Sequence, residues 1–107
     1  MLDIGARVLV AEPDPKMAEI MEGLLARQGF EVVVTGEGRE ALRKILSEAP
    51  DAILVDSSLP GVGGLDICRM LKQNKSTRRI PLGFLTGDDE DTKVSTAAQQ
   101  VGVLLLI

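Results

Sequence analysis

The strongest constraint on the fold is a regular alternation of short apolar segments with longer amphipathic ones. The apolar segments are rich in Val, Ile and Leu and are bounded by Gly, Pro or Asp, a pattern typical of strands covered on both faces. The predicted strands are residues 7–11, 31–35, 51–56, 81–86 and 103–107.

Between these strands, apolar residues recur at helical spacing. The first predicted helix begins at the N-terminal cap Asp14-Pro15 and ends at Gly29. Its core-facing side chains are expected to be Met17, Ile20, Met21, Leu24 and Leu25. The second helix ends at Pro50, the third carries Leu65 to Leu71, and the fourth spans residues 88–100.

Five strands alternating with four helices predict an α/β fold with a doubly wound, five-stranded parallel sheet and right-handed crossovers. In such folds the functional site lies at the carboxyl ends of the strands, where the strand order reverses. The residues that directly follow each strand are therefore the candidates for function.

Composition removes several classes of function. The 107 residues suffice for one domain, and they contain no histidine and one cysteine, Cys68, which excludes a zinc site and a Ser-His or Cys-His nucleophile. A net charge of −4 and two aromatic residues disfavour nucleic-acid binding. No apolar run is long enough for a membrane span, and a single cysteine suits a reducing compartment, so we expect a cytoplasmic protein.

Polar residues follow three of the strands. Glu12 and Asp14 come after the first, Asp56 ends the third, and Thr86 with Gly87 ends the fourth. Carboxylates that converge on one sheet edge can hold a hard divalent cation such as Mg²⁺. One of them can also attack a phosphoryl group and form an acyl phosphate.

Structural roles are an alternative for each of these residues. Asp14 before a proline is typical of a helix cap, and Asp56 suits a turn. The acids of residues 88–91 suit a solvated helix start, since negative charge is favourable there. Cys68 lies on an apolar helix face, as a buried structural thiol would.

The chain resembles a response regulator receiver domain of the CheY-like type. The resemblance rests on residues 8–15, on the block of residues 51–61, on residues 63–68 and on residues 80–87, and it spans essentially the whole chain in order. It implies a two-component signalling module that accepts a phosphoryl group and switches a protein-interaction surface.

The resemblance also implies roles for individual residues. Asp56 matches the phosphoacceptor and Thr86 the switch hydroxyl, while Ser57, Ser58 and Gly87 line the phosphoryl site. Mg²⁺ would be held by Glu12, Asp56 and the backbone carbonyl of Ser58. The implied partners are a histidine kinase or phosphotransfer protein, an output domain or partner protein, and a second copy of the chain.

The sequence departs from the family pattern in three places. Pro13 replaces the second of two adjacent acids, and the Asp14 side chain is expected to point away, so Mg²⁺ binding should be weakened. Leu106 stands where the family usually has an aromatic switch residue. The family's lysine after the last strand is not reached by Ile107, so we expect one receiver domain over residues 1–107 that stops before its last helix.

Three hypotheses therefore stand. The first is a receiver phosphorylated on Asp56, with no enzymatic activity beyond self-catalysed transfer onto that residue. The second is a pseudo-receiver that keeps the fold as an interaction module, which Pro13 favours. The third is a fragment of a flavodoxin-like or other small α/β enzyme, disfavoured because no G-x-G-x-x-G loop follows the first strand.

Overall fold

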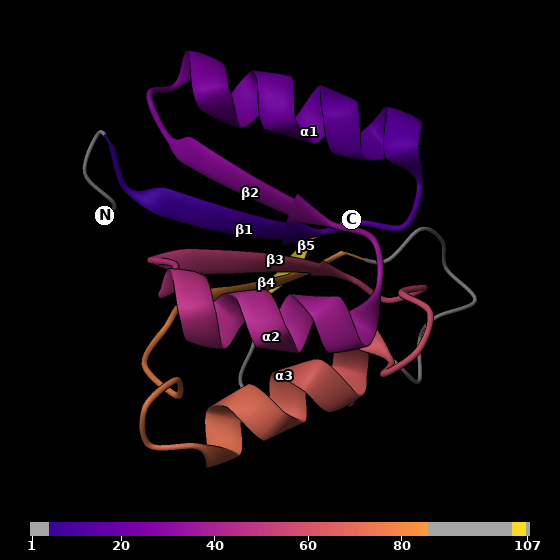
Figure 1. The fold of residues 1–107 in the computed structure, drawn as a ribbon, viewed down its shortest axis with the longest axis vertical. Helices are drawn as coiled ribbons and strands as arrows, with labels where there is room; N and C mark the ends of the chain where they lie inside the picture. The colour runs from indigo at the N-terminus through magenta and orange to yellow at the C-terminus, as the bar shows by residue number, and fades with distance from the viewer. Residues whose placement is uncertain (1–4, 86–103, 107) are drawn as a thin grey trace.

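Five parallel strands form one sheet in the computed structural model, which describes residues 5–85 and 104–106 (Figure 1). The strand order is β2-β1-β3-β4-β5. The strands are β1 (Arg7–Ala11), β2 (Glu31–Thr35), β3 (Ala52–Asp56), β4 (Leu82–Leu85) and β5 (Leu104–Leu106). The predicted doubly wound, five-stranded parallel sheet is confirmed.

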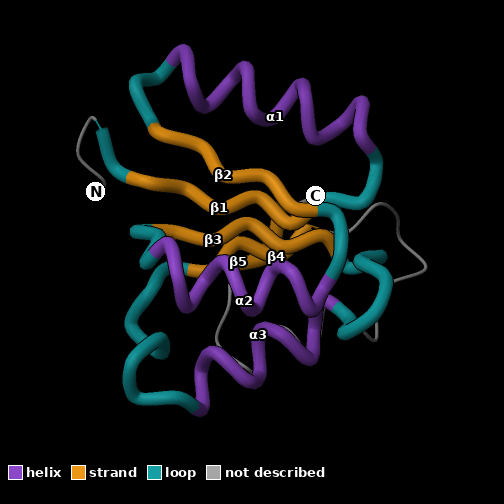
Figure 2. The backbone as a smooth tube through the Cα atoms, viewed as in Figure 1, coloured by secondary structure: helices purple, strands orange, loops and turns teal. Residues whose placement is uncertain are grey.

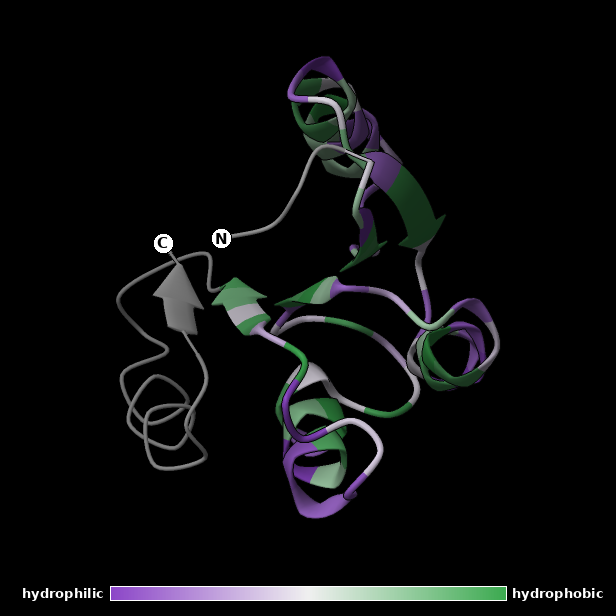
Figure 3. Ribbon diagram, turned by 90° about the vertical axis from the view of Figure 1, so that its left-hand side faces the viewer, coloured by the Kyte–Doolittle hydropathy of each residue, from purple (hydrophilic) through white to green (hydrophobic). Residues whose placement is uncertain are grey.

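Three helices lie in the described part of the chain: α1 (Pro15–Arg27), α2 (Gly38–Glu48) and α3 (Gly64–Gln73). Seen along the sheet, α1 covers one face, while α2 and α3 cover the other (Figure 3). Figure 2 shows how each helix returns the chain to the start of the next parallel strand. The predicted helix at residues 88–100 lies outside the described residues.

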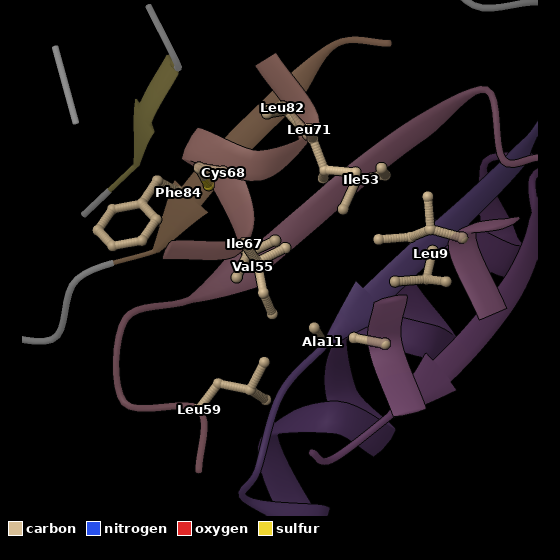
Figure 4. Packing of buried hydrophobic residues seen from close by; sticks show 12 residues of the cluster. Leu9, Ala11, Ile53, Val55, Leu59, Ile67, Cys68, Leu71, Leu82 and Phe84 are labelled. Carbon is tan, nitrogen blue, oxygen red and sulfur yellow. The ribbon is translucent and has the colours of Figure 1, made fainter. Parts of the chain in front are cut away.

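The alternation of side chains along each strand divides the core into two layers. Leu9 of β1 and Ile53 and Val55 of β3 point toward α2 and α3 and are fully buried. Figure 4 shows Ile67 of α3 beside Val55, and Cys68 of α3 beside Phe84 of β4. The neighbouring residues Val8 and Val10 belong to the thinner layer under α1.

The expected core face of α1 is only half right. Met21 and Leu25 pack against the strands, but Met17, Ile20 and Leu24 are 44, 55 and 55% exposed. The apolar face of this helix is wider than the part of a helix surface that can contact a sheet. The sheet therefore covers one edge of the stripe and leaves the other edge uncovered by the described residues.

The sheet reverses its winding direction between β1 and β3. β1 pairs with β2 on one side and with β3 on the other, and Ala11 lies opposite Val55 in the register of β1 and β3. Glu12 follows Ala11, and Asp56 follows Val55. The fold therefore places these two carboxyl groups side by side at the switch point.

Within the described ranges, no helix is both long enough and apolar enough to cross a membrane.

Candidate functional site

Glu12 is a buried carboxyl group at the carboxyl end of β1, with 5% of its surface exposed. Its backbone N–H donates to the carbonyl of Thr35, which fixes the residue beside β2. Burial, reinforced by a side-chain hydrogen bond with Asp56, raises the pKa of Glu12 to about 7. At neutral pH the group is therefore divided between its acid and its carboxylate forms.

Asp56 ends β3 and is only partly buried. Its Oδ1 atom accepts two hydrogen bonds from Ser58, one from the backbone N–H at 2.7 Å and one from the hydroxyl at 2.6 Å. The Glu12 side chain also forms a hydrogen bond with the Asp56 side chain. One oxygen of Asp56 is therefore held by the loop, and the side chain as a whole lies beside the carboxyl group of Glu12.

Pro13 and Asp14 lead from Glu12 into α1. The Asp14 backbone N–H donates to Oε2 of Glu12 at 3.0 Å, and this bond opposes the rise in the pKa of Glu12. The Asp14 side chain instead caps α1, because its Oδ1 accepts from the Lys16 N–H at 3.0 Å. The carboxylate of Asp14 thus serves the helix, as its structural alternative predicted.

The loop from Ser57 to Gly63 is anchored at several points. The Ser57 N–H donates to the Leu85 carbonyl at 2.8 Å, which ties the loop to β4. Leu59 is 4% exposed and reaches into the main core (Figure 4). The loop that carries the Ser58 donor is therefore held firmly against the sheet edge.

Two glycines that the sequence analysis did not single out hold this loop by close packing. Gly38 opens α2, and its N–H donates to the Pro60 carbonyl at 2.9 Å. A Cβ atom at Gly38 would overlap the backbone of Val62, and one at Gly64 would overlap the carbonyl oxygen of Asp56. The signal in the sequence is a glycine at the first position of both helices, directly after the capping residues Glu37 and Gly63.

Thr86 and Gly87 lie outside the described residues, so their predicted roles remain predictions. The side chain of Leu106 is likewise outside the described part of the molecule. The structure brings together Glu12, Asp56 and Ser58, and these three residues form the candidate site.

The donor set suits a hard cation. Two carboxyl groups meet at one edge, and burial together with the neighbouring Asp56 raises the pKa of Glu12. A divalent cation would offset this cost of ionising Glu12. Among the described residues there is no group of three or more His, Cys, Asp or Glu side chains that could hold a metal. Pro13 contributes no ligand, so backbone oxygen and water would have to complete the coordination.

Comparison with known proteins decides the family. The model of the response regulator receiver domain matches residues 8–106. The chain belongs to the response regulator receiver family. A receiver domain of this family typically works as a signalling module without enzymatic activity of its own, in agreement with the expectation from the sequence.

Curated relatives of this receiver domain are longer regulators. The DNA-binding response regulator MtrA of Mycolicibacterium smegmatis is 35% identical over 88 residues, which cover 82% of this chain and 37% of that protein. The alkaline phosphatase synthesis transcriptional regulatory protein PhoP of Bacillus subtilis is 33% identical over 88 residues, covering 82% and 36%. The chain thus spans a little over a third of the length of these relatives.

Solved structures agree with the CheY-like fold. The signal receiver domain of a signal transduction histidine kinase from Syntrophus aciditrophicus has a TM-score of 0.86 and 29% identity, covering 96% of this chain and 77% of that one. The receiver domain of the sensor histidine kinase PA1611 from Pseudomonas aeruginosa has a TM-score of 0.83 and 26% identity, covering 95% and 84%. That second structure holds a magnesium ion coordinated in its active-site cleft.

Proposed function

We propose that this receiver domain accepts a phosphoryl group on Asp56 and passes the change to a protein-interaction surface. The observation that carries the proposal is the paired site at the switch point: Asp56 beside Glu12, with one Asp56 oxygen held by Ser58. A carboxylate that is held at one oxygen by Ser58 is oriented for attack through its other oxygen.

The reaction transfers a phosphoryl group from a histidine side chain to an aspartate side chain. A free oxygen of Asp56 attacks the phosphorus atom of a phosphohistidine on the partner kinase or phosphotransfer protein. The new P–O bond forms as the P–N bond breaks, and the imidazole leaves with the electron pair. The product on this chain is an acyl phosphate, which water can later hydrolyse.

Mg²⁺ fits this site through oxygen ligands. Glu12, Asp56 and the backbone carbonyl of Ser58 are the groups that would hold the ion, and when bound it would offset negative charge on the transferred group. Glu12 must lose its proton to bind, and its pKa near 7 makes binding weaker in mildly acid solution. The missing acid at Pro13 further reduces the expected affinity.

The partners follow from the chemistry and the family. A histidine kinase or phosphotransfer protein supplies the phosphoryl group, and an output domain or partner protein receives the signal. The relatives named as DNA-binding or transcriptional regulators suggest a transcriptional output for the whole protein. We place this signalling in the cytoplasm, where the single buried thiol of Cys68 stays reduced.

Intact mass after incubation with acetyl phosphate and Mg²⁺ tests the proposal. The chain should gain the mass of one phosphoryl group, and Asp56→Asn should gain none. Asp66→Asn is the matched control, because it makes the same change at an exposed residue of α3 outside the candidate site. A modified Asp56→Asn variant would show that the phosphoryl group goes elsewhere.

The second candidate function is a pseudo-receiver that works only as an interaction module. Pro13 at a ligand position, with the Asp14 carboxylate engaged as a helix cap, is the observation that favours it. A chain that stays unmodified while Pro13→Asp gains the phosphoryl mass would support this candidate. Equal modification of both chains would remove it.

A further inference from the structure

A groove lies between α2 and α3, and none of the three residues of the candidate site lines it. Two hollows, of about 210 and 330 Å³, share Leu46 and Thr77 as lining residues and therefore lie next to each other. We call this the α2–α3 groove. It is defined by Leu42, Leu46, Ala49, Met70, Thr77 and Ile80.

The groove exposes apolar side chains to solvent. Leu46 on α2 is 70% exposed and Met70 on α3 is 48% exposed. The two helices lie next to each other on the same face of the sheet (Figure 1), so these side chains stand on opposite walls of one depression. Exposed apolar groups that gather in a groove are typical of a binding surface.

The α3 wall of the groove is preorganised by hydrogen bonds. The hydroxyl of Thr77, a residue only 5% exposed, donates to the Leu71 carbonyl at 2.7 Å and closes the turn after α3. The Asn74 side chain accepts from the Ser76 N–H at 2.9 Å and from the Ser76 hydroxyl at 2.8 Å. A wall fixed in this way loses little entropy when a ligand binds.

The segment that forms the α3 wall is rich in positive charge. Residues 67–85 contain five cations and no acid, in a chain with a net charge of −4. The five are Arg69, Lys72, Lys75, Arg78 and Arg79. All except Lys72 are exposed, and within residues 5–85 no acid forms an ion pair with Lys75, Arg78 or Arg79.

We propose that the α2–α3 groove docks an acidic amphipathic helix of a partner protein. An apolar stripe at helical spacing would cover Leu46 and Met70, and carboxylates on its flanks would face the cations of residues 67–85. Nucleic acid fits less well, because the groove has an apolar lining and no aromatic residue on which a base could stack. The surface would serve partner choice, since complementary charge raises association rate and specificity.

A second copy of the chain is a weaker occupant. The exposed apolar residues of α1 are accompanied by both acids and bases, namely Lys16, Glu19, Glu22 and Arg27, so this helix offers no net negative charge. Docking α1 of one copy into the groove of the next would also be a head-to-tail contact, which gives a ring only if the rotation closes.

Titration of the 107-residue chain with a synthetic peptide tests the proposal by NMR and calorimetry. The peptide is a helix with leucines on one face and glutamates elsewhere, and its matched partner carries lysines in place of the glutamates. The glutamate peptide should shift the backbone signals around Leu46, Met70 and Thr77. The lysine peptide should bind at least tenfold more weakly, a difference of about 1.4 kcal/mol.

Variants locate the contact. Leu46→Gln should weaken the glutamate peptide about tenfold, and the double change Arg78→Glu and Arg79→Glu should weaken it similarly and reduce its dependence on salt. Ile20→Gln is the matched control, since Ile20 is an exposed apolar residue on α1, and it should leave the affinity unchanged. Asp56→Asn should also leave it unchanged, so the result is independent of the proposed phosphorylation.

Three outcomes would overturn the proposal. They are peptide-induced shifts centred on α1, equal binding of the two peptides, and full affinity in Leu46→Gln despite an unchanged circular dichroism spectrum. Self-association of the chain that Leu46→Gln abolishes in sedimentation would assign the groove to a second copy and would overturn it as well.

Discussion

Glu12 should make the stability of this domain fall as the pH rises, and Glu12→Gln should remove that effect. The carboxyl group is buried beside Asp56, and its pKa in the folded chain is about 7, against 4.5 for an ordinary glutamate. Glutamine keeps the size of the side chain and can still accept from the Asp14 N–H, but it cannot ionise.

The sign of the effect is set by proton binding in the two states. Between about pH 4.5 and pH 7 the unfolded chain has released the Glu12 proton and the folded chain still holds it. The folded state therefore binds more protons, and the free energy of unfolding decreases as the pH rises through this interval. Below pH 4.5 and above pH 7 the two states carry the same charge at Glu12, so its contribution is level there.

The size of the effect is set by the two pKa values. A difference of one between folded and unfolded pKa corresponds to about 1.4 kcal/mol, so 4.5 against 7 sets an upper limit of about 3 kcal/mol. Part of this free-energy cost is shared with Asp56. The free energy of unfolding is therefore expected to fall by about 1 to 3 kcal/mol between pH 4.5 and pH 7. In a domain of this size, 1 kcal/mol moves the midpoint of thermal unfolding by roughly 4–8 °C.

Urea unfolding at a series of pH values from 4 to 9, without divalent cations, measures the effect. The unchanged chain should lose stability up to about pH 7, while Glu12→Gln should lose markedly less over the same interval. Glu22→Gln is the matched control, because Glu22 is exposed on α1 and its removal changes the net charge equally. If the slope with pH is the same in Glu12→Gln as in Glu22→Gln, the assignment of a buried acid to Glu12 is wrong.

Three further results are expected. Gly38→Ala should destabilise the fold by about 1–3 kcal/mol, because its Cβ would overlap the Val62 backbone. Denaturant unfolding measures this loss against Gly23→Ala, whose added Cβ meets nothing within 4 Å. Cys68 should resist alkylation until the chain unfolds, since burial raises the pKa of its thiol to about 11; rapid labelling of the folded chain at pH 8 would contradict this. Ser58→Ala removes the hydroxyl hydrogen bond to Asp56 and keeps the backbone one. It should therefore change the rate of phosphorylation by acetyl phosphate, while the free energy of unfolding falls by only about 1 kcal/mol. An unchanged rate would refute a positioning role for the hydroxyl.

Most of the fold could be predicted because the strands carry two signals in the sequence, namely their apolar β-branched composition and the residues that end them. Residues 7–11 and 31–35 coincide with β1 and β2, since apolar β-branched runs end sharply at Gly, Pro or polar residues. The face of α1 was less predictable. Its apolar residues fit one helical stripe, and nothing in the local pattern says how much of the stripe another element covers.

The site could be predicted in part for a similar reason. The positions of Glu12 and Asp56 depend on where apolar strands end, because parallel strands bring their carboxyl ends to one edge. The sequence could not show that Ser58 holds an Asp56 oxygen or that Gly38 packs against the loop. Both depend on the path of the chain between residues 57 and 63, which no periodicity specifies.

Pro13 changes what the remaining carboxyl groups must do. With no acid at this position and Asp14 engaged as a helix cap, the negative charge of the described site is concentrated in Glu12 and Asp56. The ionised pair destabilises the folded chain, and a bound cation would offset that cost. Mg²⁺ bound at this pair would link cation binding to folding stability. By binding only the folded chain, the ion would restore stability that ionised Glu12 removes above pH 7. A site with fewer acids would in this way still favour a bound cation, because the two ionised carboxylates repel each other without one.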